Sequence, residues 1–116
     1  MEKILNIYGR QVKFKSTAAF LHRYKAQFGR DALQDLFKIE QSVDKDGKSI
    51  HDISALDLGV LFEMVWTLAK TADPSIPTPM EWLDEFSEFP LIDHLPEFMD
   101  MIRSSFKGTV ESKKKV

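Results

Sequence analysis

Apolar and polar residues alternate near the start of the chain. Val12 and Phe14 are separated by a lysine, and such alternation is typical of a half-buried strand. Segment 4–7 is also rich in residues that favour strands. Gly9 lies between the two segments and suits the first central position of a type II′ turn, at Gly9-Arg10. The pattern therefore predicts a short N-terminal β-hairpin at about 3–15, which must pack against other elements to be stable.

After residue 16 the apolar residues recur every three or four positions, which is the spacing of one helix face. Ser16 or Thr17 can cap the first helix, and Gly29 can end it in a left-handed conformation. Asp31 can cap the next helix. The predicted helices cover about 17–28, 31–40, 55–71, 79–89 and 91–106. In the second of them the expected apolar stripe consists of Leu33, Leu36 and Phe37.

Cap and stop signals set the bounds of the later helices. Ser54 followed by Asp57 resembles a helix start, and Asp73-Pro74 ends that helix. Thr78-Pro79 combines an N-cap with proline at the first helical position. Pro96 allows two alternatives for the last helix: either the helix starts near Pro96, or Pro96 lies within its first turn, where the missing N–H costs little. We expect Gly108 to end this helix. Its predicted stripe is Leu95, Phe98, Met99, Ile102 and Phe106.

These elements define the expected fold class and organisation. We expect a mainly α protein, a compact helical domain of about five helices with a short N-terminal β-hairpin. The 116 residues fit one domain, which we place at 1–108. The polar segment 109–116 ends in a lysine run, and we expect it to be a disordered basic tail.

Composition narrows the class of protein. The chain is 43% hydrophobic and 29% charged, which is typical of a globular protein. It has no cysteine, which fits a reducing compartment and excludes disulfides and thiolate chemistry. We see no signal peptide at the N-terminus and no apolar run long enough to span a bilayer. We therefore expect a cytoplasmic protein that does not contact membranes.

No set of residues matches a catalytic or metal site. The loop 44–47 resembles an EF-hand in its glycine, but Ser42 would stand at position one and Ile53 where a bidentate glutamate is required. His94 and Glu97 share a helix face, yet two ligands fall short of a catalytic zinc site. We expect no enzymatic activity, no metal and no cofactor.

Nucleic-acid binding is also disfavoured. The two helices around Gly29 resemble a helix-turn-helix, but the second carries Asp31, Asp35 and Glu40, where a recognition helix needs hydrogen-bond donors. The chain as a whole has a net charge of −2, whereas nucleic-acid-binding domains are basic.

The most informative helix is the one predicted at 55–71, which is apolar around nearly its whole circumference. A helix of this kind must be buried on all sides, and the central core helix of the domain is one explanation. The aromatic residues that surround it exceed what a small core needs, so the other explanation is a partly exposed apolar surface that binds partner helices or a second copy. The expected partner-binding residues are Phe62, Trp66, Trp82, Phe86 and Phe89.

The order of elements resembles a known family. A hairpin with a glycine turn leads into a Phe/Leu helix over 14–29, a second small helix, a loop and a strongly apolar helix over 56–72. An acidic segment with tryptophan follows at 81–86, and then a Leu/Phe/Met helix. Over about 3–107 the chain resembles the tail assembly chaperones of long-tailed, siphovirus-type bacteriophages and prophages of Gram-positive bacteria.

The resemblance implies a function in tail assembly. Such chaperones bind the long helical tape-measure protein, keep it soluble and help to recruit tail-tube subunits of the major tail protein. They act in the cytoplasm of the bacterial host and are generally absent from the mature virion. Two alternatives stay open: a small structural component of the phage head–tail junction or tail, and a regulatory DNA-binding protein.

Overall fold

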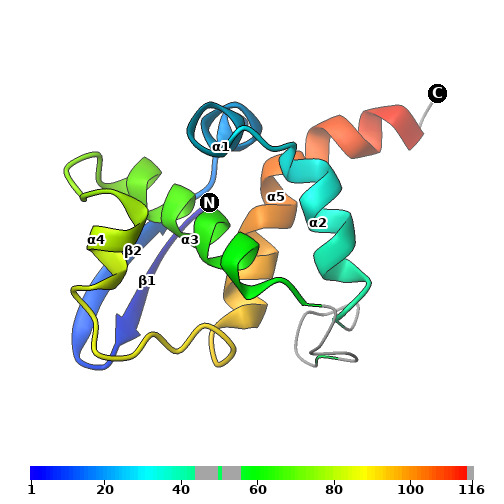
Figure 1. The fold of residues 1–116 in the computed structure, drawn as a ribbon. Helices are drawn as coiled ribbons and strands as arrows, with labels where there is room; N and C mark the ends of the chain where they lie inside the picture. The colour runs from blue at the N-terminus through cyan, green and yellow to red at the C-terminus, as the bar shows by residue number, and fades with distance from the viewer. Residues whose placement is uncertain (44–49, 51–55, 115–116) are drawn as a thin grey trace.

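The computed structural model describes residues 1–43, Ile50 and 56–114, with the backbone alone from residue 108 onward. Five helices and one two-stranded antiparallel sheet make up this part of the chain (Figure 1). In order they are β1 Glu2–Ile7, β2 Arg10–Lys15, α1 Phe20–Phe28, α2 Ala32–Glu40, α3 Leu58–Ala72, α4 Pro79–Leu83 and α5 Leu95–Lys114. The predicted arrangement of five helices with an N-terminal hairpin is confirmed.

The hairpin forms as predicted, but its turn differs. Ile7 pairs with Arg10, so the two central residues are Tyr8 and Gly9. Both have positive φ, 50° and 89°, which defines a type I′ turn, and the predicted type II′ turn at Gly9-Arg10 is wrong. The backbone N–H of Gly9 donates to Oδ1 of Asn6 at 2.6 Å, and this contact stabilises the tighter turn.

Helices α1 and α2 form a short helical hairpin. Gly29 adopts the predicted left-handed conformation, with φ of 72°, and Asp31 caps α2 by accepting from the backbone N–H groups of Leu33 and Gln34. The start of α1 differs from the prediction, because its N-cap is Ala19. The hydroxyl of Thr17 instead accepts from the N–H of Ala19 and organises the turn before the helix.

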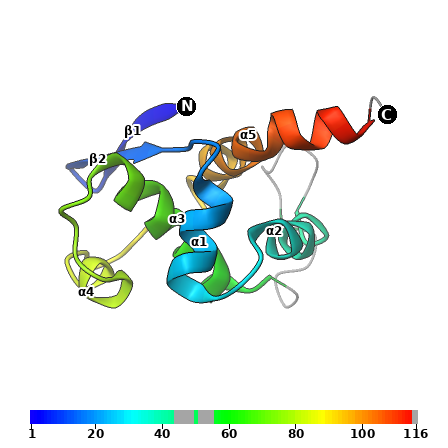
Figure 2. The same cartoon turned by 90° about the horizontal axis from the view of Figure 1, so that it is seen from above.

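Helix α3 is the central element. Its buried face packs against β2 and α1 (Figure 2), so the role of core helix is confirmed. It begins at Leu58, capped by Asp57, and ends before Asp73. The predicted cap Ser54 lies outside the described residues, as does most of the loop predicted at 41–53. Val43 and Ile50, at either end of that loop, form an isolated antiparallel bridge.

Helix α4 is much shorter than predicted and ends at Leu83, so the expectation of a helix to Phe89 is wrong. The rings of Phe86 and Phe89 both pack on Trp82, with centroids at 5.1 and 5.6 Å. Arg10 of the hairpin lies over the Phe86 ring at 4.6 Å. A short helix is marginal by itself, and these tertiary contacts favour a folded-back segment over continued helix.

Helix α5 begins at Leu95 and holds Pro96 in its first turn, as one of the predicted alternatives required. The predicted stripe from Leu95 to Phe106 is buried. The helix does not end at Gly108 but continues to Lys114, so the predicted helix end at Gly108 is wrong. Glycine in a helix costs only about 1 kcal/mol relative to alanine, and no proline follows it here. In both ribbon views the last turns extend beyond the other elements (Figures 1 and 2).

Candidate functional site

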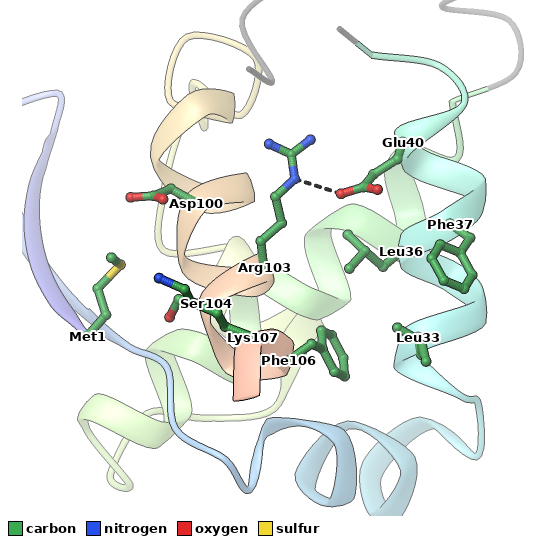
Figure 3. A pocket seen from close by; sticks show the side chains of 10 residues that line it. All are labelled: Met1, Leu33, Leu36, Phe37, Glu40, Asp100, Arg103, Ser104, Phe106 and Lys107. Atoms are coloured by element: carbon green, nitrogen blue, oxygen red, sulfur yellow. Dashed lines mark hydrogen bonds and ion pairs between the residues drawn. The ribbon is translucent and has the colours of Figure 1, made fainter. Parts of the chain in front are cut away.

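A groove of about 620 Å³ lies between α2 and α5. Figure 3 shows Leu36 of α2 and Phe106 of α5 pointing into the space between the two helices, while Asp100 and Lys107 lie on the side of α5 that faces Met1. The groove is lined by Met1, Leu33, Leu36, Phe37, Glu40, Asp100, Arg103, Ser104, Phe106 and Lys107. The groove is the candidate binding site, since binding sites are typically concave and mostly apolar.

The floor of the groove is buried and its rim is exposed. Leu36 and Phe106 are only 4% and 6% exposed. Phe37, the next residue of α2, is 55% exposed, and Leu33 lies one turn before it. An exposed aromatic ring beside an apolar floor is the arrangement that accepts the apolar face of an amphipathic helix.

Ion pairs shape the polar side of the groove. Nε of Arg103 donates to Oε1 of Glu40 at 2.6 Å and thereby joins α5 to α2 (Figure 3). Nζ of Lys3 lies 3.3 Å from Oδ2 of Asp100. Lys107 is exposed, and in the part of the chain that is described no carboxylate pairs with it. Its ammonium group is therefore accessible to a partner.

The structure buries two of the residues expected at a partner surface. Trp82 is 1% and Trp66 is 5% exposed. The indole N–H of Trp66 donates to the carbonyl oxygen of Pro77 at 2.9 Å, which satisfies its polar atom. The expectation that these two tryptophans lie on a partly exposed surface is wrong. Phe86 and Phe89 fold back onto Trp82 instead of extending α4, and the local contacts of Trp66 cover its ring.

The remaining expected residues, Phe62, Phe86 and Phe89, are partly buried. Their rings pack together, with centroids 5.8 Å apart for Phe62 and Phe89 and 5.2 Å for Phe86 and Phe89. The structure thus brings four of the five expected residues into one aromatic cluster, which consists of Phe62, Trp82, Phe86 and Phe89. Trp66 packs instead on Phe28, at 5.8 Å. Most of this apolar surface is used within the chain.

Sequence reasoning missed the groove, because Phe37 was placed in the buried stripe of α2. The buried positions of that helix are Ala32, Asp35, Leu36 and Ile39. Phe37 follows Leu36 directly and therefore points away from this buried face. The signal was available in the spacing: Ala32, Leu36 and Ile39 already fill one helix face. Leu33 and Phe37, four residues apart, then form a second apolar stripe on the neighbouring face.

A charged network joins the first three helices away from the groove. The Tyr24 hydroxyl donates to Oδ2 of Asp35 at 2.8 Å, and Arg30 contacts both groups and Glu63. Burial, and then the neighbouring Asp35 carboxylate, raise the pKa of Tyr24 well above its usual range. The phenol therefore stays protonated, and the network holds α1 to α2 and α3.

His94 and Glu97 lie on one face of the chain, as their spacing indicated, with Nδ1 and Oε2 3.9 Å apart. No third ligand joins them: the described residues contain no group of three or more histidine, cysteine, aspartate or glutamate side chains placed to hold a metal ion.

Comparisons with known proteins add no assignment. No protein-family model, curated protein or solved structure matches the chain. Within the described part of the chain, no helix is long and apolar enough to cross a membrane.

Proposed function

We propose that this chain is an assembly chaperone of a long-tailed phage, and that it holds an amphipathic helix of the tape-measure protein in the groove between α2 and α5. It also helps to recruit subunits of the major tail protein during tail assembly. The biological setting comes from the resemblance in the order of elements. The proposed site comes from the groove.

The observation that supports the proposal most is the exposure of Phe37 beside an apolar floor. Amphipathic helices bind such grooves through apolar residues spaced three and four positions apart. Leu33, Leu36 and Phe37 line one wall, and Phe106 extends the apolar surface to the other. Truncating a buried aromatic anchor at an interface typically costs about 2 kcal/mol or more of binding free energy.

The proposed role also assigns a location. The chaperone acts in the cytoplasm of the bacterial host, where the tape-measure protein is made, and leaves before the virion is complete. A chaperone that must release its client fits a groove lined by mixed apolar and ion-paired residues, since such an interface is smaller and wetter than a permanent one.

Binding of the purified chain to a phage tape-measure protein tests the proposal. Phe37→Ala removes the exposed ring without disturbing the core, so we expect binding about 30-fold weaker, as for the loss of about 2 kcal/mol. Met80→Ala is the matched control, because Met80 is 77% exposed on α4, outside the groove. Isothermal titration calorimetry measures both variants.

Three results would distinguish the proposed function from its alternatives. Equal affinity for the wild-type protein and Phe37→Ala would contradict the groove as the binding site. Mass spectrometry of purified virions that finds the chain in stoichiometric amounts would favour the structural head–tail component. Tight, salt-dependent binding to duplex DNA would favour the regulatory DNA-binding protein.

A further inference from the structure

The exposed face of α5 carries a charge pattern that is complementary to itself. Asp100, Arg103, Ser104 and Lys107 follow one another at positions i, i+3, i+4 and i+7, and all four line the groove (Figure 3). Residues at this spacing lie on one helix face. The stripe begins with a carboxylate and ends with an ammonium group, about two helical turns or ~10.5 Å further on.

We infer that this face binds a second copy of the chain, with the two α5 helices antiparallel about a twofold axis between Arg103 and Ser104. In that register Asp100 of each copy, which is also ion-paired with Lys3 of its own chain at 3.3 Å, lies opposite Lys107 of the other. A twofold interface uses the same patch on both copies and must therefore be self-complementary. The stripe meets this condition, because the twofold axis generates two pairs of Asp100 with Lys107.

Two further features favour a second copy as the occupant. Lys107 has no carboxylate partner among the described residues, and the twofold arrangement supplies one. Arg103, which lies near the axis, is ion-paired with Glu40 of its own chain at 2.6 Å, so its charge is compensated there. The hydroxyl of Ser104 beside it is likewise satisfied within the chain, by the hydroxyl of Ser16 at 3.1 Å.

The second copy also covers the apolar groove. Phe37 is 55% exposed on the wall that flanks the α5 stripe, and apolar surface of this kind is removed from water by association. Self-association and client binding then exclude each other at this groove, a consequence that rests on the proposed function. The dimer itself uses only residues of this chain and stands without any client.

Charge reversal tests the register. Asp100→Lys and Lys107→Glu each turn both cross-dimer attractions into repulsions, so each variant alone should associate about tenfold more weakly than the wild-type chain. In a mixture of the two variants every opposing pair is again opposite in charge. We expect the mixture, and the double variant D100K/K107E, to recover association in sedimentation equilibrium at low salt.

Lys25→Glu is the matched control for Lys107→Glu, since it makes the same change of charge on α1, outside the groove, and should leave association unchanged. Circular dichroism melting checks that each variant is folded. A wild-type chain that stays monomeric at the highest soluble concentration would overturn the inference. So would single variants that associate like the wild type, or a mixture that fails to recover. In these cases a client binding that still needs Phe37 would leave the proposed function intact.

Discussion

The phenyl ring of Phe37 lies in solvent on the rim of the α2/α5 groove, although α2 buries Leu36 and Ile39 on the adjacent face. Because its ring is 55% exposed, Phe37 is not part of the hydrophobic core, and packing within the chain does not explain its position. The proposed interface would account for its position, because aromatic residues are enriched at the buried centres of interfaces.

Trp82 illustrates the opposite case, since the structure places it in the core. Its indole contacts the rings of Phe86 and Phe89 and is 1% exposed. Removing a buried aromatic side chain typically destabilises a protein by about 3–5 kcal/mol. We therefore expect Trp82→Ala to lower the free energy of unfolding by this amount, measured by chemical denaturation.

Met80→Ala, two residues away and 77% exposed, provides the comparison. Surface substitutions of this kind usually change stability by less than about 0.5 kcal/mol. If Trp82→Ala were as stable as Met80→Ala, the packing of residues 84–94 over the tryptophan would be wrong.

At the scale of elements, the network of Tyr24, Arg30 and Asp35 joins α1 to α2, and Glu63 extends it to α3. The fold raises the pKa of Tyr24 above its ordinary value of 10.0, first through burial and then through Asp35. A raised pKa means that the protonated phenol is favoured in the folded state. The stabilisation that the protonated phenol gives to the folded state is therefore complete below about pH 10 and is lost as the pH rises above that value.

Tyr24→Phe tests this coupling. We expect the variant to be about 1 kcal/mol less stable than the wild type near neutral pH, because a buried hydrogen bond to Asp35 is lost. Above about pH 10 the wild-type free energy of unfolding should fall more steeply than that of the variant, so that the two curves converge. Parallel curves from urea denaturation across this range would contradict the account.

The elements that could be predicted from the sequence are those defined by local signals. The helix end at Gly29 and the cap at Asp31 depend on residues within one turn, and both are confirmed. The hairpin and the central helix also followed from periodicity, which is the strongest local signal.

The elements that were mispredicted depend on contacts distant in the sequence. Residues 84–89 could continue α4 on propensity alone, but Arg10 of the hairpin contacts Phe86 and pairs with Glu85 at 2.8 Å. A stop at Gly108 was a reasonable local inference, yet glycine alone does not end a helix. The candidate site was missed for a different, local reason. Leu33 and Phe37 were assigned to the buried stripe of α2, although Ala32, Leu36 and Ile39 already fill its buried face.

At the scale of the whole molecule, the aromatic cluster and the groove lie in different parts of the structure. Trp82, Phe86 and Phe89 connect α4 and the segment after it to the hairpin side, where Arg10 contacts them. The groove lies between α2 and α5, which contribute nine of its ten lining residues. A partner held in the groove would leave the aromatic cluster undisturbed, although Leu36 and Phe106 on the groove floor also belong to the hydrophobic core.

The most direct test of the central claim is amide hydrogen exchange of the chain with and without the helical tape-measure protein. Binding in the groove should slow the exchange of α2 and of residues 95–107 in α5, because covered backbone amides open less often. The hairpin and residues 82–89 should exchange at unchanged rates. Protection centred on residues 82–89, with none in α2 and α5, would contradict the groove as the site that holds the partner.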